Sequence, residues 1–322
     1  MLWKYDVIAV GSATVDRILT MREEFSSVKL GDKILLETVE KFSGGGATNT
    51  AAAFSTLGLK TAMITKLGRD EEGDFIEKEM RRDYGVKNLC QHRSHKKTDL
   101  AFIVTSLKEK DRVIFVQKGA SPELRGTDFR KSSLRSKWIY LSTLIGNSFS
   151  TAKEIAELAQ RKKISLLFNP SLYLAQKGKK YLSPVLRRCN IVVCNLEEAQ
   201  ALLGIDSKDR VKLLRGIQKL GPRRVIITNS VRKLHAIDED LRYSYLPPKA
   251  QVRSTTGAGD AFTAGFLAGI IKGKSFKESL QVGQMNAISI IQYAGAKNKL
   301  LNFAEASREL KKYPFKITVK EL

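Results

Sequence analysis

The sequence has few of the residues that cross-link a chain or carry it through a membrane. It contains 3 cysteines and 7 prolines among 322 residues, and Cys90, Cys189 and Cys194 are too scattered for a disulfide framework. No apolar run approaches the roughly 20 residues that a membrane-spanning helix needs. The N-terminal residues lack the basic region and small-residue cleavage site of a secretory signal. We therefore expect a cytoplasmic protein with no membrane partner.

Acidic residues are also scarce. The chain has 33 Asp and Glu against 56 Lys and Arg, a net charge of +23, and such a field attracts polyanions and phosphorylated ligands. The basic residues are spread through nearly every segment, without interleaved aromatic side chains on which bases could stack. This pattern favours a basic surface that attracts nucleotides and argues against a nucleic-acid partner. With 43% hydrophobic residues, the chain is otherwise an ordinary globular sequence.

Short apolar segments alternate with amphipathic ones along the chain. The apolar segments have buried-strand character on both faces, and they cover residues 5–10, 61–67, 138–142, 164–169, 191–194 and 225–228. The amphipathic segments predict helices at 48–57, 71–84, 151–161, 209–220, 259–271, 277–291 and 303–311. This alternation predicts an α/β fold with one mainly parallel sheet and helices on both of its faces.

Two stretches interrupt this alternation, at about 14–42 and about 97–118. They contain strand-like segments at 34–39, 101–106 and 113–117 with no helix between them, and 108–111 is a polar turn. We expect a small antiparallel sheet inserted at one edge, which could serve as a lid over an active site or merely decorate the rim. Because no linker is evident, residues 1–322 are predicted to form a single domain.

The segment 254–262 combines small residues with an acid at the start of a predicted helix. Gly257, Ala258 and Gly259 allow a tight turn that directs backbone N–H groups at an anion. Thr255 and Thr256 can cap the helix or touch a phosphate oxygen. Asp260, in the first helical turn, is placed to act as a general base. The alternative interpretation is an ordinary capped helix.

Two other nucleotide-binding patterns do not fit. The dinucleotide fingerprint requires a third glycine at the position of Phe262. The segment 269–275 resembles a P-loop but has three residues between its glycines where four are required. Zinc ligation by Cys90, His92 and His95 lacks a second ligand group at matching spacing. These observations argue against a Rossmann dehydrogenase, a P-loop kinase and a zinc site.

A second glycine-rich segment, 43–51, also leads into a predicted helix. Gly44, Gly45 and Gly46 let a ligand approach the main chain, and Asn49 offers both a donor and an acceptor to vicinal hydroxyls. Because the segment carries no positive charge, it suits a neutral polyol better than a phosphate. It could also be a simple strand-to-helix turn.

Together, the two segments resemble the signatures of the PfkB, or ribokinase-like, family of carbohydrate and nucleoside kinases. The first signature is matched from Gly44 through Asn49 to Gly58 and Gly68, and the second from Ser254 through Asp260 to 264–265. Two signatures in the right order are far more specific than either alone. The resemblance covers almost the whole chain and implies a ribokinase-like αβα sandwich with a small β-sheet lid.

The resemblance also implies roles for individual residues. Asp260 would be the catalytic base, with the amides of Gly257, Ala258 and Gly259 stabilising the transferring phosphoryl group. The acceptor would be bound by Asp16, Gly45, Gly46 and Asn49. ATP or ADP would be bound by Thr228, Ser230, Thr256, Gly257, Gly259, Asn286 and Gly295. Asn195 and Glu198, in an Asn-x-x-Glu element, would help to hold Mg²⁺, although they could equally be a helix cap that needs no metal.

Some residues depart from the family pattern. Ser254 stands in place of an acid that helps to form a monovalent-cation site, and Lys299 in place of a small hydroxyl residue, which argues against potassium activation. Gly46 replaces the lysine of typical ribokinases, so ribose is not assured as the acceptor. Ser230 stands where a glycine is common, in the predicted nucleotide loop.

The sequence thus predicts Mg²⁺-dependent transfer of a terminal nucleotide phosphate to a hydroxyl of a sugar or polyol. The alternatives are a nucleoside kinase of the same family and a non-catalytic binding protein that keeps the fold. Lid strands of this kind can pair between subunits, so a homodimer through the lid is also open.

Overall fold

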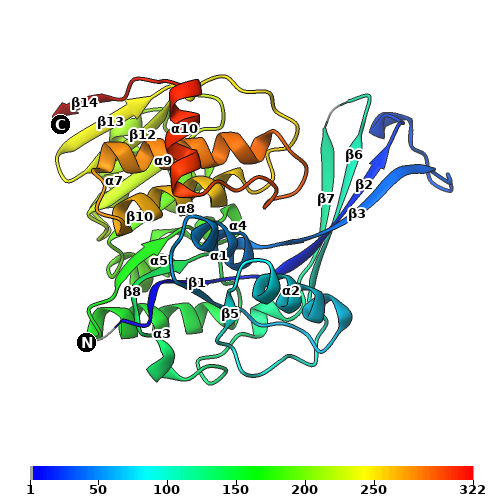
Figure 1. Cartoon of the computed structure of the whole chain (residues 1–322), viewed down its shortest axis with the longest axis horizontal. Helices are drawn as coiled ribbons and strands as arrows, with labels where there is room; N and C mark the ends of the chain where they lie inside the picture. The colour runs from blue at the N-terminus through cyan, green and yellow to red at the C-terminus, as the bar shows by residue number, and fades with distance from the viewer. Residues whose placement is uncertain (1–2, 110, 322) are drawn as a thin grey trace.

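A central sheet of mainly parallel strands forms the middle layer of the protein. The computed structural model describes residues 3–109 and 111–321. Within them, ten strands follow the order β14-β13-β12-β11-β10-β9-β8-β1-β4-β5 (Figure 1). The seven parallel strands are β1 (Tyr5–Val10), β4 (Thr61–Ile64), β5 (Lys87–Asn88), β8 (Ser136–Leu141), β9 (Ser165–Phe168), β10 (Ile191–Asn195) and β11 (Arg224–Thr228). The predicted mainly parallel sheet is confirmed.

An antiparallel extension on one edge of this sheet was not predicted. It consists of β12 (Leu234–Asp238), β13 (Leu241–Tyr245) and β14 (Thr318–Glu321), which continue outward from β11. The turn between β12 and β13 contains Glu239, which has a left-handed backbone (φ 53°). Hairpin turns of this length are usually marked by Asn-Gly or Asp-Gly, so a Glu-Asp turn leaves a weak signal in the sequence.

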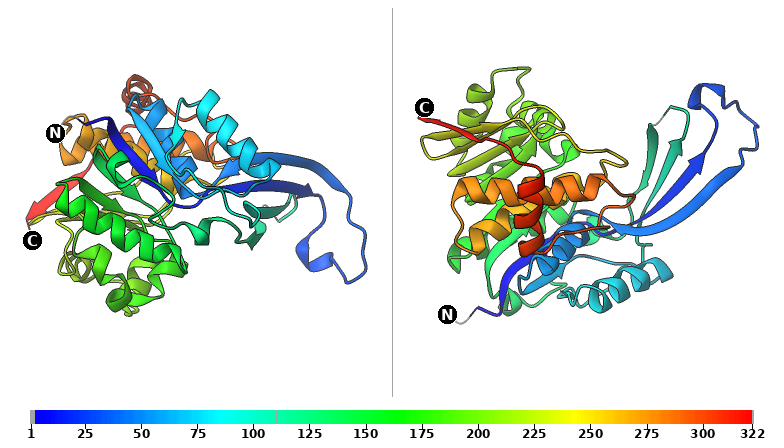
Figure 2. Two further views of the ribbon diagram at one scale, coloured as in Figure 1. Left: turned by 90° about the horizontal axis from the view of Figure 1, so that it is seen from below. Right: turned by 45° about the horizontal axis from the view of Figure 1, so that its top comes forward.

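Helices cover both faces of the central sheet, as predicted (Figure 2). One face packs against α1 (Gly46–Thr56), α2 (Glu71–Arg82), α8 (Ala258–Ile271), α9 (Phe276–Ile291) and α10 (Phe303–Lys312). The other packs against α3 (Ser148–Arg161), α4 (Leu172–Ala175), α5 (Gly178–Leu186), α6 (Leu196–Leu203) and α7 (Arg210–Gln218). Short 3₁₀ turns lie at Phe25–Ser27, Ser121–Glu123 and Lys131–Ser133. None of the helices in the described residues is long and apolar enough to cross a membrane.

A second, four-stranded sheet projects from one end of the body (Figure 1). We call it the lid; its strands are β2 (Thr14–Met21), β3 (Leu36–Gly44), β6 (Asp99–Ser106) and β7 (Arg112–Gln117). The outer pairs, β3–β2 and β6–β7, are antiparallel, whereas the central pair, β2–β6, is parallel. The sequence predicted a purely antiparallel insertion and no separate strand at 14–21. Residue 110 of the predicted 108–111 turn and the chain ends (1–2, 322) lie outside the described residues.

Candidate active site

Asp260 lies in the first turn of α8, in the position predicted for a base. The helix begins at Gly257, whose backbone is left-handed (φ 79°). Asp260 Oδ2 accepts a hydrogen bond from Asn49 Nδ2 at 2.8 Å, and Oδ1 accepts one from the Tyr140 hydroxyl at 3.5 Å. Burial raises the pKa of Asp260 to about 6, and these two hydrogen bonds oppose the rise. The carboxylate is therefore held at both oxygens and is ionised at neutral pH.

Tyr140 and Asn169 form a hydrogen-bonded chain that leads to Asp260, and neither of them was identified as a site residue from the sequence. Tyr140, in β8, is fully buried, and its hydroxyl lies 3.0 Å from Asn169 Oδ1 as well as 3.5 Å from Asp260. Asn169 is held in turn by its Nδ2, which donates to the Val193 carbonyl at 2.7 Å. Tyr140 reads as a core residue of an apolar strand, so no sequence signal marked it. Asn169 directly follows β9, and its polarity at a parallel strand end was the available signal.

A cavity of about 410 Å³ opens beside Asp260; we call it the acceptor cavity, after the role proposed for it below, and call the second cavity described next the donor cavity. The body contributes strand ends and the start of helices, among them Ser12, Gly46, Ser142, Asn169, Gly257, Gly259 and Asp260. The lid side contributes Val116, Lys118 and Ser121. The cavity thus lies between lid and body, where the proposed base can meet a bound alcohol.

A donor cavity of about 760 Å³ lies on the other side of the α8 N-terminus. Its lining includes the turn with Ser230 and Val231, Pro247 and Pro248 after β13, and Ala287, Ile288 and Ile291 on α9. Ser230 has a left-handed backbone (φ 49°), which explains why glycine suits this position. The two cavities share Asn195, Thr228 and Gly259. Asn195 and Thr228 are neighbours across β10 and β11, so the carboxyl ends of these strands join the cavities beside Asp260.

The early glycine turn packs too tightly for side chains. Gly45 has φ 94°, and a Cβ there would lie 2.6 Å from the Ser12 carbonyl oxygen. On Gly46 a Cβ would lie 2.0 Å from Ser142 Oγ, and on Gly44 2.2 Å from Asp16 Oδ2. These glycines let the backbone, Asp16 and the cavity wall approach one another closely.

Asp16 lies on β2 of the lid, close enough to Asp260 for their charges to interact. Burial raises the pKa of Asp16 to about 6; Lys297 and Lys118 oppose the rise, and Asp260 adds to it. Lys297 was not predicted. Its Nζ donates to the Ser43 carbonyl at 2.7 Å and lies 3.2 Å from Glu79 Oε2. Lys297 therefore links the start of the glycine turn to α2.

Asn195 and Glu198 form a capping box at the start of α6. Asn195 Oδ1 accepts from the Glu198 N–H at 2.8 Å, and Glu198 Oε2 accepts from the Asn195 N–H at 2.8 Å. Burial raises the pKa of Glu198 to about 7, helped by the charges of Glu197 and Asp260. The capping alternative from the sequence is thus present in the structure, and Glu198 also lines the acceptor cavity.

The side-chain oxygens of Asn195 and Glu198 are suitable ligands for a partly hydrated hard cation such as Mg²⁺. The described residues contain no cluster of three or more His, Cys, Asp or Glu that could hold a metal by itself. Mg²⁺ usually binds through one or two protein oxygens while keeping waters and phosphate ligands, so it needs no such cluster. Glu198 Oε1 takes no part in the capping box, and Glu198 and Asn195 both line the acceptor cavity, so the two residues offer oxygen ligands of the kind that Mg²⁺ binds.

The lid also reaches the loop that precedes α8. Arg112, at the start of β7, donates from Nη2 to Thr255 Oγ1 at 2.9 Å. In the same loop the Ala258 N–H donates to the Thr255 carbonyl at 3.3 Å. Other N–H groups in the first turn of a helix have no acceptor within the helix and are available to an anion.

Not every predicted nucleotide residue is brought to the donor cavity. Asn286 is fully buried; it donates to the Ala261 carbonyl at 3.1 Å and accepts from the Leu301 N–H at 3.1 Å, so its amide holds the protein together. A Cβ on Gly295 would lie 3.1 Å from the Phe42 ring, which places this glycine against the base of the lid. Thr256 donates its N–H to Ser254 Oγ at 3.2 Å. Thr228, Ser230 and Gly259 do line the donor cavity.

Comparisons with known proteins show which family and fold the chain shares. The model of the pfkB family of carbohydrate kinases matches residues 4–302. An ATP-dependent 6-phosphofructokinase of Thermoanaerobacterium thermosaccharolyticum is 26% identical over 91% of this chain and 90% of its own length. A 5-dehydro-2-deoxygluconokinase of Halalkalibacterium halodurans is 28% identical over 89% of each. The structure of Arabidopsis thaliana ribokinase complexed with ribose and ATP superposes with a TM-score of 0.80, at 22% identity, over 95% of this chain and 99% of the other.

The family match spans nearly the whole chain, including both glycine-rich segments and the lid. The neighbouring structure shares the complete fold. The chain therefore belongs to the pfkB family of carbohydrate kinases and is a phosphotransferase that acts on an alcohol group.

Proposed function

We propose that this protein transfers the terminal phosphate of ATP or ADP to a hydroxyl of a sugar or polyol, with Mg²⁺ and with Asp260 as the general base. The observation that carries the proposal is the position of Asp260 in the wall of the acceptor cavity, next to Gly259, which lines both cavities. Its pKa of about 6 leaves it ionised and able to accept a proton at neutral pH.

In the proposed reaction, Asp260 accepts the proton of the acceptor hydroxyl as that oxygen forms a bond to the terminal phosphorus. The bond from phosphorus to the bridging oxygen of the nucleotide breaks, and the shortened nucleotide leaves. The transition state is loose, so positioning and charge stabilisation supply most of the rate. Asn49 and Tyr140 hold the carboxylate in place, and N–H groups at the start of α8 stabilise the phosphoryl oxygens.

The remaining predicted site residues divide between the two ligands. Asp16, with Gly45, Gly46 and Asn49, would bind the other hydroxyls of the acceptor. Thr228, Ser230 and Gly259 would bind the nucleotide, whose base would lie against the apolar wall of the donor cavity. Asn195 and Glu198 would hold Mg²⁺, which neutralises phosphate charge when it is bound.

Replacing Asp260 by Asn tests the assignment of the base. We expect kcat to fall by about 10²–10⁴-fold with little change in KM, because asparagine keeps the shape but cannot accept the proton. Coupled assays of nucleotide turnover over a panel of sugars and polyols, with ATP and with ADP, measure this. Asp209→Asn, at the N-cap of α7 and outside the lining of both cavities, is the matched control. Near-normal transfer by a folded Asp260→Asn protein would refute the assignment.

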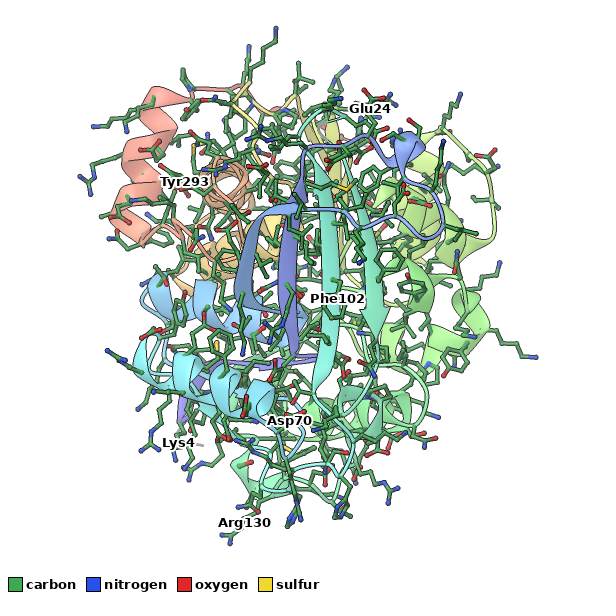
Figure 3. The ribbon with its side chains drawn as sticks, turned by 90° about the vertical axis from the view of Figure 1, so that its right-hand side faces the viewer. Lys4, Glu24, Asp70, Phe102, Arg130 and Tyr293 are labelled. Carbon is green, nitrogen blue, oxygen red and sulfur yellow. The ribbon has the colours of Figure 1, made fainter. Side chains whose placement is uncertain are left out.

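We also propose that the chain acts as one domain whose lid pairs with the lid of a second copy. The outer lid face turns away from the body, and Figure 3 looks onto it with Phe102 labelled. Phe102 pairs with Phe115 across β6 and β7, and the two side chains are 39% and 58% exposed. Val113 (40%) and Val39 (58%) are also exposed. Exposed apolar side chains on a projecting sheet are typical of a surface that another copy covers.

A further inference from the structure

The inner face of the lid presents a cation that the proposed reaction does not use. Lys118 directly follows β7 and lines the acceptor cavity together with Asp260. Among the described residues that line this cavity, Lys118 is the one with a positive charge. The other ionisable groups there include two carboxylates, Asp260 and Glu198. An anionic part of a ligand would therefore be attracted to one end of the cavity.

Lys118 forms an ion pair with Asp99, whose carboxylate also accepts hydrogen bonds from other groups. Lys118 Nζ lies 3.2 Å from Oδ2 of Asp99, a fully buried carboxylate. Asp99 Oδ1 also accepts the N–H groups of Gly119 and Ser121, each at 3.0 Å, and Oδ2 accepts the Ser121 hydroxyl. An ammonium group has three protons to donate, and the Lys118 side chain is 37% exposed. Lys118 can therefore bind a second anion while Asp99 stays hydrogen-bonded.

The register of the lid relates Lys118 to Asp16, which does not itself line the cavity. Asp16 on β2 pairs with Ala101 on β6, and Ala101 pairs with Val116 on β7, so all three share the inner face. Lys118 lies two residues beyond Val116, near that face. The strands β2 and β7 are two spacings apart, roughly 10 Å. The positive charge of Lys118 also lowers the pKa of Asp16 from across this gap.

We propose that Lys118 binds an anionic group, a carboxylate or a phosphate, carried by the acceptor at the end remote from the reacting hydroxyl. This inference rests on the proposed function and specifies its acceptor class. Lys118 would orient the acceptor, because an anion placed at the opposite end would face Asp260 and Glu198. A charge-assisted hydrogen bond of this kind changes binding by about tenfold or more.

The test compares matched acceptors with and without the anion. Transfer from MgATP is measured for gluconate against glucose and for fructose 6-phosphate against fructose. We expect one of the anionic acceptors to have a kcat/KM at least tenfold above its neutral counterpart. In Lys118→Met this ratio should collapse toward one, mainly through KM, and Lys118→Arg should restore part of it. Lys41→Met removes a lid lysine from the outer face, where it lies beside Glu72, and should keep the wild-type ratio.

The outcomes separate this inference from the proposed function. Preference for gluconate or for fructose 6-phosphate identifies the anion as carboxylate or phosphate. A ratio near one in the wild type, or a preference that survives Lys118→Met, overturns the inference while transfer itself still supports the kinase. If the wild type transfers phosphate to none of these acceptors, the increase in Tm on adding each compound at constant ionic strength decides the role of Lys118. A larger increase with an anionic compound that Lys118→Met abolishes supports it; equal increases in both proteins, or none, refute it.

Discussion

The acceptor and donor cavities meet at the same three residues but are built differently. The acceptor cavity is the smaller, about 410 against 760 Å³, and it lies among carboxylates with raised pKa values and draws part of its wall from the lid. The donor cavity draws its wall from the body, with somewhat more apolar than polar side chains, and its lining includes the charged residues Glu197 and Lys249. We therefore expect binding of the acceptor to depend on pH, and the base of the donor nucleotide to contact the apolar part of the donor cavity.

A methyl group can be added at Gly259, which lines both cavities, without a clash in the fold. A Cβ on Gly259 meets no atom within 4 Å, whereas one on Gly257 would lie 2.5 Å from Ala296 Cβ and sit on a left-handed backbone. We expect Gly259→Ala to keep the wild-type Tm but lower kcat/KM for the nucleotide by about 100-fold, because its methyl group occupies the space where the phosphoryl group passes.

Gly257→Ala is the matched comparison for this change. Strain at this position should lower both Tm and activity, by on the order of 1–3 kcal/mol in stability. Thermal melting and steady-state kinetics on both variants separate the two effects. A Gly259→Ala protein with unaltered kcat/KM would show that phosphate does not pass there.

The acceptor side should respond to pH through Asp260. Because a general base must be ionised, kcat/KM should rise with pH up to about 6, the pKa of Asp260, and then level off. The Tyr140 hydrogen bond lowers this pKa, so Tyr140→Phe should move the rising limb to higher pH and reduce kcat by about tenfold. Tyr84→Phe, which changes a partly buried tyrosine outside both cavities, should leave the pH profile of kcat/KM unchanged. If the rising limb of kcat/KM against pH is at the same pH in Tyr140→Phe as in the wild type, Tyr140 does not have this positioning role.

The smallest effect on catalysis is expected on the outer lid face, which lines neither cavity. Phe115→Asp should convert the proposed dimer to a monomer, because two buried charges would face each other across the interface. Sedimentation velocity measures the change, and kcat should fall by less than about threefold, since Phe115 touches no ligand site. A wild-type protein that sediments as a monomer at every concentration would exclude pairing through the lid.

The raised pKa of Asp260 also makes the stability of the fold depend on pH. The pKa of Asp260 in the folded state is raised above the value of 3.8 expected without burial, so its protonated form is favoured by folding. Its contribution to stability is therefore largest below that value and is lost as the pH rises through about 6. The ionised form of Asp260, which the proposed reaction needs, is therefore also the form that stabilises the fold less.

Much of the secondary structure of the body could be predicted from the sequence, because the pattern of neighbouring residues agrees with the fold. Strand segments such as 191–194 are apolar on both faces because helices cover both sides of the sheet. The turn at Gly257 and the acid at Asp260 carry their meaning in consecutive residues, so their position at the start of α8 was predictable. The β12–β13 hairpin was missed because its Glu-Asp turn has no glycine to mark it.

What the sequence by itself determined is the alternation of strands and helices in the body, the two glycine turns and the acid that follows the second, since each depends on neighbouring residues. Only the tertiary structure decided the contacts over long separations: Asn49 with Asp260, Tyr140 beneath that carboxylate, and Lys118 across the lid from Asp16. It also turned Asn286 inward to hold Ala261 and Leu301. The physical reason is that a hydrogen bond between distant segments depends on how the sheets and helices pack, which no local pattern of residue types records.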